Sequence, residues 1–323
     1  MASGATVPKS HAMDELNLPP RATGRVRDGV ASVVLDITGL DAAAADALEV
    51  TARAAVAAAG IADVRLLRTA ERAQRRLIAI ASGKGGVGKS TLSANLAVAL
   101  RGLGRAAGLV DADIQGPSQA RLFGVEGTKP KARDSRMIPV ETPAGVPLLS
   151  MAMLVPEGQA IAWRGPMVSN ALGQMIDGHW EGVDPLLLDL PPGTGDIQLT
   201  MIQKHRPAGA VIVSTPQDLA LIDARRAIDL FAKAGVPVIG LVENMAGYAC
   251  PHCGEVSDPF GHGGAEAEAA RLDLQFLGRI PLSREIRLAS DGGVPPAAGN
   301  GADGAAFVSV AQHINTWLLA NGG

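Results

Sequence analysis

The sequence predicts an α/β fold: a mostly parallel sheet with helices on both faces, preceded by a small, shortened α+β domain. From residue 77 onward, short apolar segments alternate with amphipathic ones. The apolar segments have the length and composition of strands that are buried on both faces. The length of 323 residues is also suitable, since it accommodates an α/β domain of about 250 residues and a smaller domain.

The chain is predicted to divide into four parts: a disordered arm (1–28), a small β-α-β domain remnant (29–70), a linker (71–76) and the main domain (77–323). The arm contains prolines and charges without periodicity. In the remnant we expect a strand, an alanine-rich helix and a second strand at 30–38, 41–59 and 64–67. Asp41 is the expected helix cap, and Gly60 the expected end of the helix.

The main domain shows the alternation most clearly. Its predicted strands are 77–82, 107–112, 147–150, 185–190, 209–215, 236–242 and 275–277. Its predicted helices lie near 90–101, 165–178, 219–234, 264–272 and 305–320. In such sheets ligands bind at the carboxyl ends of the strands, so we expect the functional residues there.

The first of these strand ends leads into Gly-Lys-Gly-Gly-Val-Gly-Lys-Ser, which matches the P-loop pattern G-x-x-x-x-G-K-[ST]. A strand, a glycine loop and a helix N-terminus together direct main-chain N–H groups at a polyphosphate. We expect Lys89 to contact the β- and γ-phosphates and the Ser90 hydroxyl to bind Mg²⁺. The predicted nucleotide-binding residues of this loop are Gly83, Lys84, Gly85, Gly86, Val87, Gly88, Lys89, Ser90 and Thr91.

Three aspartates follow two later strands. We expect Asp113 to orient the attacking water and Asp111 to support the Mg²⁺ shell, although either could instead cap the next turn. Asp189 ends the apolar segment 186–188 and would also support Mg²⁺. The stiff loop 191–196 that follows could sense the γ-phosphate.

Asn244 follows a further predicted strand, 236–242. Its side chain offers both a donor and an acceptor, the pair needed to bind the edge of adenine. A residue that stabilises a turn is the competing interpretation.

Cys250 and Cys253 are the only cysteines of the chain. Two thiolates supply half of the four ligands that a 4Fe–4S cluster or a structural zinc usually needs. Three interpretations stay open: a second subunit brings the missing pair, His252 and His262 complete a zinc site, or the thiols are redox-active or inert.

The bulk composition points away from several other classes of function. The net charge of −3 gives no electrostatic basis for nucleic-acid binding. No apolar run is long enough to span a bilayer, and the first twenty residues lack the layout of a secretory signal. We therefore expect a cytoplasmic protein that binds neither nucleic acid nor membranes.

Residues 77–323 resemble the Mrp/ApbC-type iron–sulfur cluster carriers, P-loop ATPases related to the partition and cell-division ATPases. The motifs that carry the resemblance are 83–91, 111–118, 163–167, 189–196, 214–218, 243–245, 250–253 with 260–261, and 280–282. Lys84, a lysine directly after the first glycine, is the "deviant" P-loop feature of ATPases that dimerise face to face around nucleotide; a solvated surface lysine is the alternative.

The resemblance implies a homodimer that holds a 4Fe–4S cluster on Cys250 and Cys253 of both subunits. It also implies that ATP binding and slow hydrolysis control transfer of the cluster, from scaffold proteins to apo-proteins, and that Lys84 reaches the partner's nucleotide. Two rivals remain. One is a partition- or positioning-type ATPase that acts by binding a surface, and the other is the same ATPase with a structural zinc.

Overall fold

The computed structural model describes residues 16–37, 40, 42–69, 75–154 and 165–321. The chain forms two compact units, Met1–Gln74 and Arg75–Gly323, which are considered separately. The boundary between them falls within the predicted linker, whose residues 71–74 lie outside the described part, as do Thr38 and Asp41 of the predicted small-domain elements.

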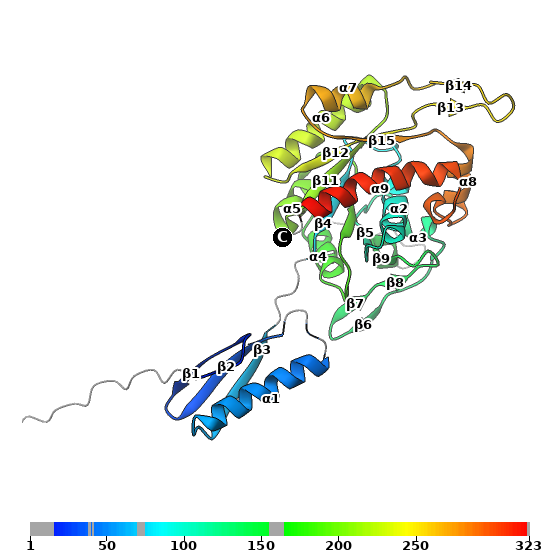
Figure 1. Ribbon diagram of the computed structural model, residues 1–323. Coiled ribbons are helices and arrows are strands. Elements are labelled where there is room, and N and C mark those ends of the chain that lie inside the picture. Colours follow the sequence, from blue (N-terminus) through cyan, green and yellow to red (C-terminus); the bar gives the residue numbers. More distant parts are fainter. Residues whose placement is uncertain (1–15, 38–39, 41, 70–74, 155–164, 322–323) are drawn as a thin grey trace, which may run out of the picture. The chain divides into compact units, whose positions relative to one another are not determined.

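The first unit contains a three-stranded sheet and one helix (Figure 1). Strand β2 (Val30–Asp36) pairs antiparallel with β1 (Ala22–Arg27) and parallel with β3 (Asp63–Thr69). Helix α1 (Ala42–Ala58) contributes Ala52 and Val56 to a core with Val33 and Leu35 of β2. The predicted strand-helix-strand is confirmed, but the disordered arm was predicted to reach residue 28, which is wrong because residues 22–27 form a strand.

The second unit contains an eight-stranded sheet in which every pairing is parallel except that of β8 with β9. In spatial order its strands are β15 (Phe276–Ile280), β12 (Val238–Asn244), β11 (Gly209–Ser214), β4 (Leu77–Ala81), β10 (Leu186–Asp189), β5 (Gly108–Asp111), β9 (Pro147–Ser150) and β8 (Val140–Glu141). The predicted mostly parallel sheet is confirmed, and each of the seven predicted strands is present.

Helices cover both faces of this sheet (Figure 1). The first face carries α2 (Lys89–Gly102), α3 (Gln119–Leu122), α8 (Arg284–Asp291) and α9 (Ala302–Ala320). The second carries α4 (Gly165–Ile176), α5 (Asp196–His205), α6 (Asp218–Lys233) and α7 (Gly264–Arg271). The strands alternate between the two cores, since Ile78 and Ile80 face the first core and Ala79 and Ala81 the second.

The five predicted helices are present, whereas α3, α5 and α8 were not predicted. Helix α9 packs on the domain through its apolar side, which buries Phe307, Val310, Ile314 and Leu318. Within the described ranges, no helix combines the length and apolarity needed to cross a membrane.

The remaining elements are short. Two hairpins are formed by β6 (Lys131–Arg133) with β7 (Arg136–Ile138) and by β13 (Tyr248–Ala249) with β14 (Val256–Ser257). Two 3₁₀ turns, η1 (Met151–Leu154) and η2 (Pro296–Ala298), complete the set.

Candidate nucleotide and metal sites

The carboxyl ends of the central parallel strands bring the predicted nucleotide-binding residues together. We call this end of the sheet, with the P-loop, Asp111 and Asp189, the nucleotide edge. Strand β4 leads into the glycine loop, and the neighbouring strands β5 and β10 end at Asp111 and Asp189. Asp189 is paired in register with Asp111 on one side and with Ile80 on the other. The loop and the two acids therefore lie side by side, although Lys89 and Asp189 are 100 residues apart in the chain.

The glycines of the loop allow close packing that side chains would prevent. Gly86 and Gly88 have φ values of 80° and 82°, a region that favours glycine. A Cβ atom at Gly88 would lie 2.0 Å from Asn244 Nδ2, and one at Gly83 would lie 2.1 Å from the main chain of Asp223 in α6. Helix α2 begins after Gly88, which has no side chain to cap it, so its first N–H groups can bind an anion.

Lys89 and Asp189 form a buried ion pair at the centre of this edge. Lys89 Nζ lies 2.5 Å from Asp189 Oδ1, and both side chains are buried. Ser93 Oγ lies 3.0 Å from the same oxygen, and Gln119 Nε2 donates to Asp189 Oδ2 at 2.7 Å. In this state the lysine that is predicted to hold phosphate is held by the carboxylate that is predicted to support Mg²⁺.

Asp111 is a second buried acid beside Asp189. It accepts hydrogen bonds from Ser150 Oγ at 2.8 Å and from the main-chain N–H of Gln119 at 3.0 Å. Burial, followed by the nearby charge of Asp189, raises the pKa of Asp111 to about 7. Because two adjacent carboxylates share one lysine, the site has an excess of negative charge that suits a hard divalent cation such as Mg²⁺.

Asp113 forms a turn. Its Oδ1 accepts hydrogen bonds from the main-chain N–H groups of Gln115 and Gly116, at 3.0 and 3.2 Å. This is the capping geometry that was weighed against a water-orienting role, so that role stays a prediction.

Asn244 lies against the glycine loop at the end of β12. Its Nδ2 donates to the carbonyl oxygen of Val87 at 2.7 Å. The structure therefore brings Asn244 to the phosphate loop, with one amide hydrogen engaged there, and its binding to adenine stays a prediction.

The predicted γ-phosphate sensor, the loop 191–196, also adjoins the P-loop. Gly193 N–H donates to Ser82 O at 3.0 Å, and Ser82 Oγ donates to the carbonyl oxygen of Lys84 at 2.9 Å. Lys84 is half-buried, and its contact with a partner's nucleotide stays a prediction.

The two cysteines lie in the hairpin that connects β13 and β14. The turn is closed by hydrogen bonds from Gly254 N–H to Cys250 O at 2.8 Å and from Cys250 N–H to Glu255 O at 2.9 Å. Cys250 is half-buried and Cys253 is exposed. The main-chain N–H groups of Cys253 and His252, together with the Cys253 thiol, lower the pKa of Cys250. A half-buried thiol with a lowered pKa, close in sequence to a second, exposed thiol, suits a soft metal centre.

The same hairpin does not gather a complete metal site from one chain. No group of three or more His, Cys, Asp and Glu side chains suited to a metal occurs in the part of the chain that the structure describes. His262 lies instead beside Asp258, with 3.5 Å between Nδ1 and Oδ1. A zinc site completed by His252 and His262 of the same chain is therefore not formed here.

Sequence reasoning missed two buried polar residues of this region, Gln119 and Glu243. Glu243 Oε2 accepts from Ala265 N–H at 2.8 Å, and Oε1 accepts from Gly263 N–H and Arg279 Nε, each at 3.2 Å. It thus ties the end of β12 to the start of α7. The sequence offered only a weak signal for them, their position next to predicted motifs. Gln119 directly follows the motif 111–118, and Glu243 directly precedes Asn244.

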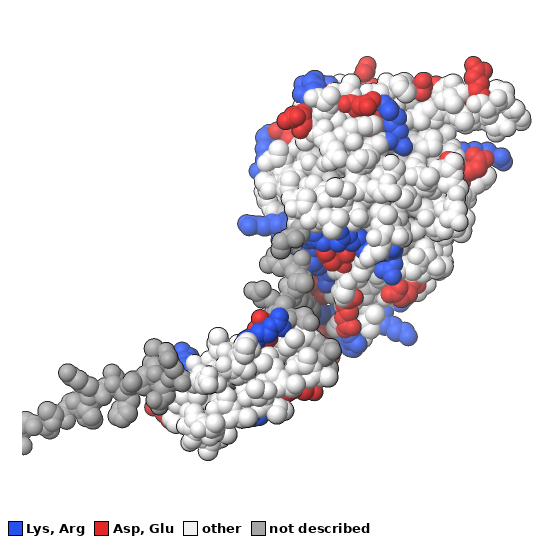
Figure 2. All heavy atoms as spheres, in the orientation of Figure 1, with Lys and Arg blue, Asp and Glu red and all other residues white. Residues whose placement is uncertain are grey.

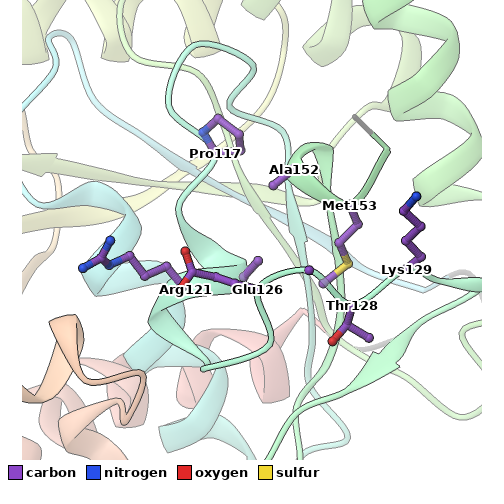
Figure 3. Close-up of a pocket in the computed structure, with 9 residues that line it drawn as sticks. Pro117, Arg121, Glu126, Thr128, Lys129, Ala152 and Met153 are labelled. Carbon is purple, nitrogen blue, oxygen red and sulfur yellow. The ribbon is translucent and has the colours of Figure 1, made fainter. Parts of the chain in front are cut away.

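A pocket of about 400 Å³ is lined by residues of α3, of the segment 126–129 and of η1 (Figure 3). Its lining includes Arg121, Glu126, Lys129 and Met153, and none of the predicted site residues. Figure 3 shows Arg121 and Lys129 pointing away from each other, so their charges do not converge on one anion. The nucleotide edge, and not this pocket, is the candidate site.

Comparison with known proteins supports this assignment. A family model described as "ParA: NUBPL iron-transfer P-loop NTPase" matches residues 73–315. A Pseudomonas fragi protein named iron-sulfur cluster carrier protein is 51% identical over 226 residues, which are 69% of this chain and 78% of that protein.

Two solved structures show the same fold. A nucleotide-binding protein from Archaeoglobus fulgidus, in complex with ADP, is 38% identical with a TM-score of 0.62, covering 71% of this chain and 89% of that one. The Pyrococcus furiosus cell division ATPase MinD is 25% identical with a TM-score of 0.56, covering 75% of this chain and 99% of that one.

Proposed function

Because the chain belongs to the NUBPL iron-transfer P-loop NTPase family, we propose that it is an ATPase that binds iron–sulfur clusters and transfers them to apo-proteins. The observation that carries this proposal is the short distance in sequence between a residue that contacts the P-loop and the cysteine pair. Asn244 at the end of β12 contacts the P-loop, and the chain reaches the thiol of Cys250 six residues later. The end of β12 therefore contacts the candidate nucleotide site, and the segment that directly follows it supplies a ligand suited to a soft metal.

In the nucleotide-bound state, Lys89 would leave Asp189 and contact the phosphates. Ser90, Asp111 and Asp189 would hold Mg²⁺, whose charge offsets that of the phosphates and the paired acids. The main-chain N–H groups of residues 83–91 would cradle the phosphates, with Asn244 at the adenine and Asp113 orienting water. Hydrolysis is expected to be slow, as the resemblance implies.

A homodimer would complete the metal site. Each chain supplies two thiols, half of the set that a 4Fe–4S cluster needs. Exposed apolar side chains near the P-loop support such a pairing of two chains. Leu219 and Ile222 of α6 are 72% and 42% exposed. They lie close in sequence to Asp223, whose main chain packs against Gly83 of the P-loop. Val256, beside the cysteine hairpin, is 66% exposed. In this dimer Lys84 would reach the partner's nucleotide.

The cluster is cargo in this proposal, received from a scaffold protein and delivered to apo iron–sulfur proteins. The Pseudomonas fragi relative is named as such a carrier. A cytoplasmic location stays a prediction from the sequence.

Anaerobic reconstitution with iron and sulfide tests the cargo role. The wild-type protein should hold about two irons per chain, as a cluster shared by two chains requires. Cys250→Ala should abolish this binding and leave ATP binding unchanged, because Cys250 lies outside the P-loop edge. His252→Ala, a change in the same turn, is the matched control and should retain iron. Zinc in the anaerobically purified protein, or iron retained by Cys250→Ala, would contradict the proposal.

Sedimentation analysis tests the dimer. With cluster, Mg²⁺ and ATP under reducing conditions, we expect a mass of twice the chain's 33.0 kDa. A strictly monomeric protein under those conditions would exclude a shared cluster.

The rival is a partition- or positioning-type ATPase, a class favoured by the likeness to MinD. Such proteins need a basic surface for DNA or a basic amphipathic helix for lipid. Figure 2 shows acidic and basic side chains interspersed on the face that it draws, and α9 buries its apolar side in the core. Cosedimentation with DNA or anionic vesicles in the presence of ATP would favour this rival.

A further inference from the structure

Gln119, at the start of the short helix α3, connects three parts of the nucleotide edge. Its side chain is fully buried. Its main-chain N–H donates to Asp111 Oδ2 at 3.0 Å, while its Nε2 donates to Asp189 Oδ2 at 2.7 Å and to Ser90 O at 2.9 Å. One residue thus contacts the two acids and the end of the P-loop that are proposed to hold Mg²⁺.

The orientation of this amide is fixed by its neighbours. Asp189 Oδ2 and Ser90 O are both acceptors, so the nitrogen of Gln119 must face them. Its oxygen, Oε1, is buried and has no hydrogen-bond partner among the described residues. A buried amide oxygen without a partner is unfavourable, which indicates that a group outside the chain donates to it.

The hydrogen bonds of Asp189 show where such a group would lie. Asp189 Oδ1 faces Lys89 Nζ and Ser93 Oγ, whereas Gln119 is the one donor to Oδ2 among the residues that the structure describes. A carboxylate oxygen can accept two hydrogen bonds. Oδ2 therefore keeps one open acceptor position, next to the amide whose Oε1 is also open.

We propose that Gln119 is a positioning residue for Mg²⁺: its Nε2 holds Asp189 in place, and its Oε1 accepts a hydrogen bond from a water of the Mg²⁺ shell. Mg²⁺ keeps several waters when it binds to proteins, and these waters need acceptors. The inference rests on the proposed binding of MgATP, and it adds a residue that the P-loop and aspartate motifs do not contain.

The test compares the affinity for a fluorescent ATP analogue in Mg²⁺ with that in EDTA. Gln119→Met keeps the bulk of the side chain and removes both the donor and the acceptor. We expect it to weaken binding about tenfold in Mg²⁺, and to leave the affinity in EDTA within about threefold of wild type. Gln312→Leu, which changes an exposed glutamine of α9, is the control and should match wild type in both buffers.

Three outcomes overturn the inference. The first is an unchanged nucleotide affinity in Gln119→Met, and the second is an affinity weakened equally in both buffers, as a merely structural role would give. The third is a wild-type affinity that does not depend on Mg²⁺. If thermal unfolding shows that Gln119→Met does not fold, Gln119→Asn replaces it. Its amide, one methylene shorter, cannot reach Asp189 Oδ2 and Ser90 O together, so the same selective loss is expected. A wild-type protein that binds no nucleotide in either buffer defeats the proposed function itself.

Discussion

The nucleotide edge and the cysteine hairpin are two candidate sites of opposite construction. The nucleotide edge gathers Lys89, Asp111, Gln119 and Asp189 from distant parts of the chain, and all four are buried and hydrogen-bonded to one another. The hairpin takes its thiols from four consecutive residues, joined to two-residue strands and largely exposed. One chain thus furnishes a connected candidate nucleotide site, whereas its hairpin offers two possible metal ligands.

The difference shows how stability is distributed between the two sites. Changes at the buried edge should alter folding as well as ligand binding, because each charge there depends on the others. Changes in the hairpin should alter metal binding alone, because the fold does not depend on the thiols. Three substitutions examine this contrast.

Lys89→Ala should have the largest effect. It removes the cation from the buried Asp189 and should lower the free energy of unfolding by about 3 kcal/mol. Nucleotide affinity should fall roughly a hundredfold as the phosphate contacts are lost. Chemical denaturation and nucleotide titration measure the two effects. Lys84→Ala, a change in the same loop at a half-buried lysine, should leave stability within about 0.5 kcal/mol of wild type. Equal losses of stability in Lys89→Ala and Lys84→Ala would show that the buried ion pair does not set Lys89 apart from the other lysine of the loop.

Asp111→Asn should stabilise the protein in Mg²⁺-free buffer. The pKa of Asp111 is raised to about 7, so the folded state keeps this proton at pH values where the unfolded chain has lost it. Stability therefore falls as the pH rises from about 4 to 7, and a neutral Asn should restore about 1 to 3 kcal/mol at pH 8.

Urea denaturation at pH 5 and pH 8 in EDTA measures this effect. The gain should be present at pH 8 and small at pH 5. Asp229→Asn changes an exposed acid of α6 and should shift stability by less than about 0.5 kcal/mol at either pH. A loss of stability at pH 8 would show that the hydrogen bonds to Asp111 outweigh its burial.

Cys253→Ala should have the smallest effect on folding. The thiol is exposed, so the free energy of unfolding of the metal-free protein should stay within about 0.5 kcal/mol of wild type. Thermal denaturation checks this under reducing conditions. A loss of more than about 1 kcal/mol would show that the hairpin is part of the structural framework.

Much of the main sheet could be predicted from sequence because its strands are almost wholly apolar. The segments that became β4, β5, β10 and β11 are buried along nearly their full length, which gives a continuous apolar run. Strand β1 lacks that signal: its six residues are exposed or half-buried, and its pairing with β2 makes it a strand.

The missed helices have a similar explanation. Helix α8 has only eight residues and buries only Ile286 and Ser290, so its apolar periodicity is too short to predict a helix. The P-loop and the three acids could be predicted at strand ends because each lies at or just after the end of an apolar segment, and the structure brings Asp111 and Asp189 together there. The hydrogen bonds of Gln119 could not be predicted, because they join residues 29 and 70 positions apart in the chain.

The position of β12 limits the distance between the proposed nucleotide site and the cysteine pair. An extended chain spans at most about 3.6 Å per residue, so the Cα atom of Cys250 stays within about 22 Å of that of Asn244. By the same limit the Cα atom of Cys253, nine residues after Asn244, stays within about 32 Å of that of Asn244. In the proposed dimer, each copy would therefore carry its thiols within a bounded distance of a strand end that contacts the P-loop.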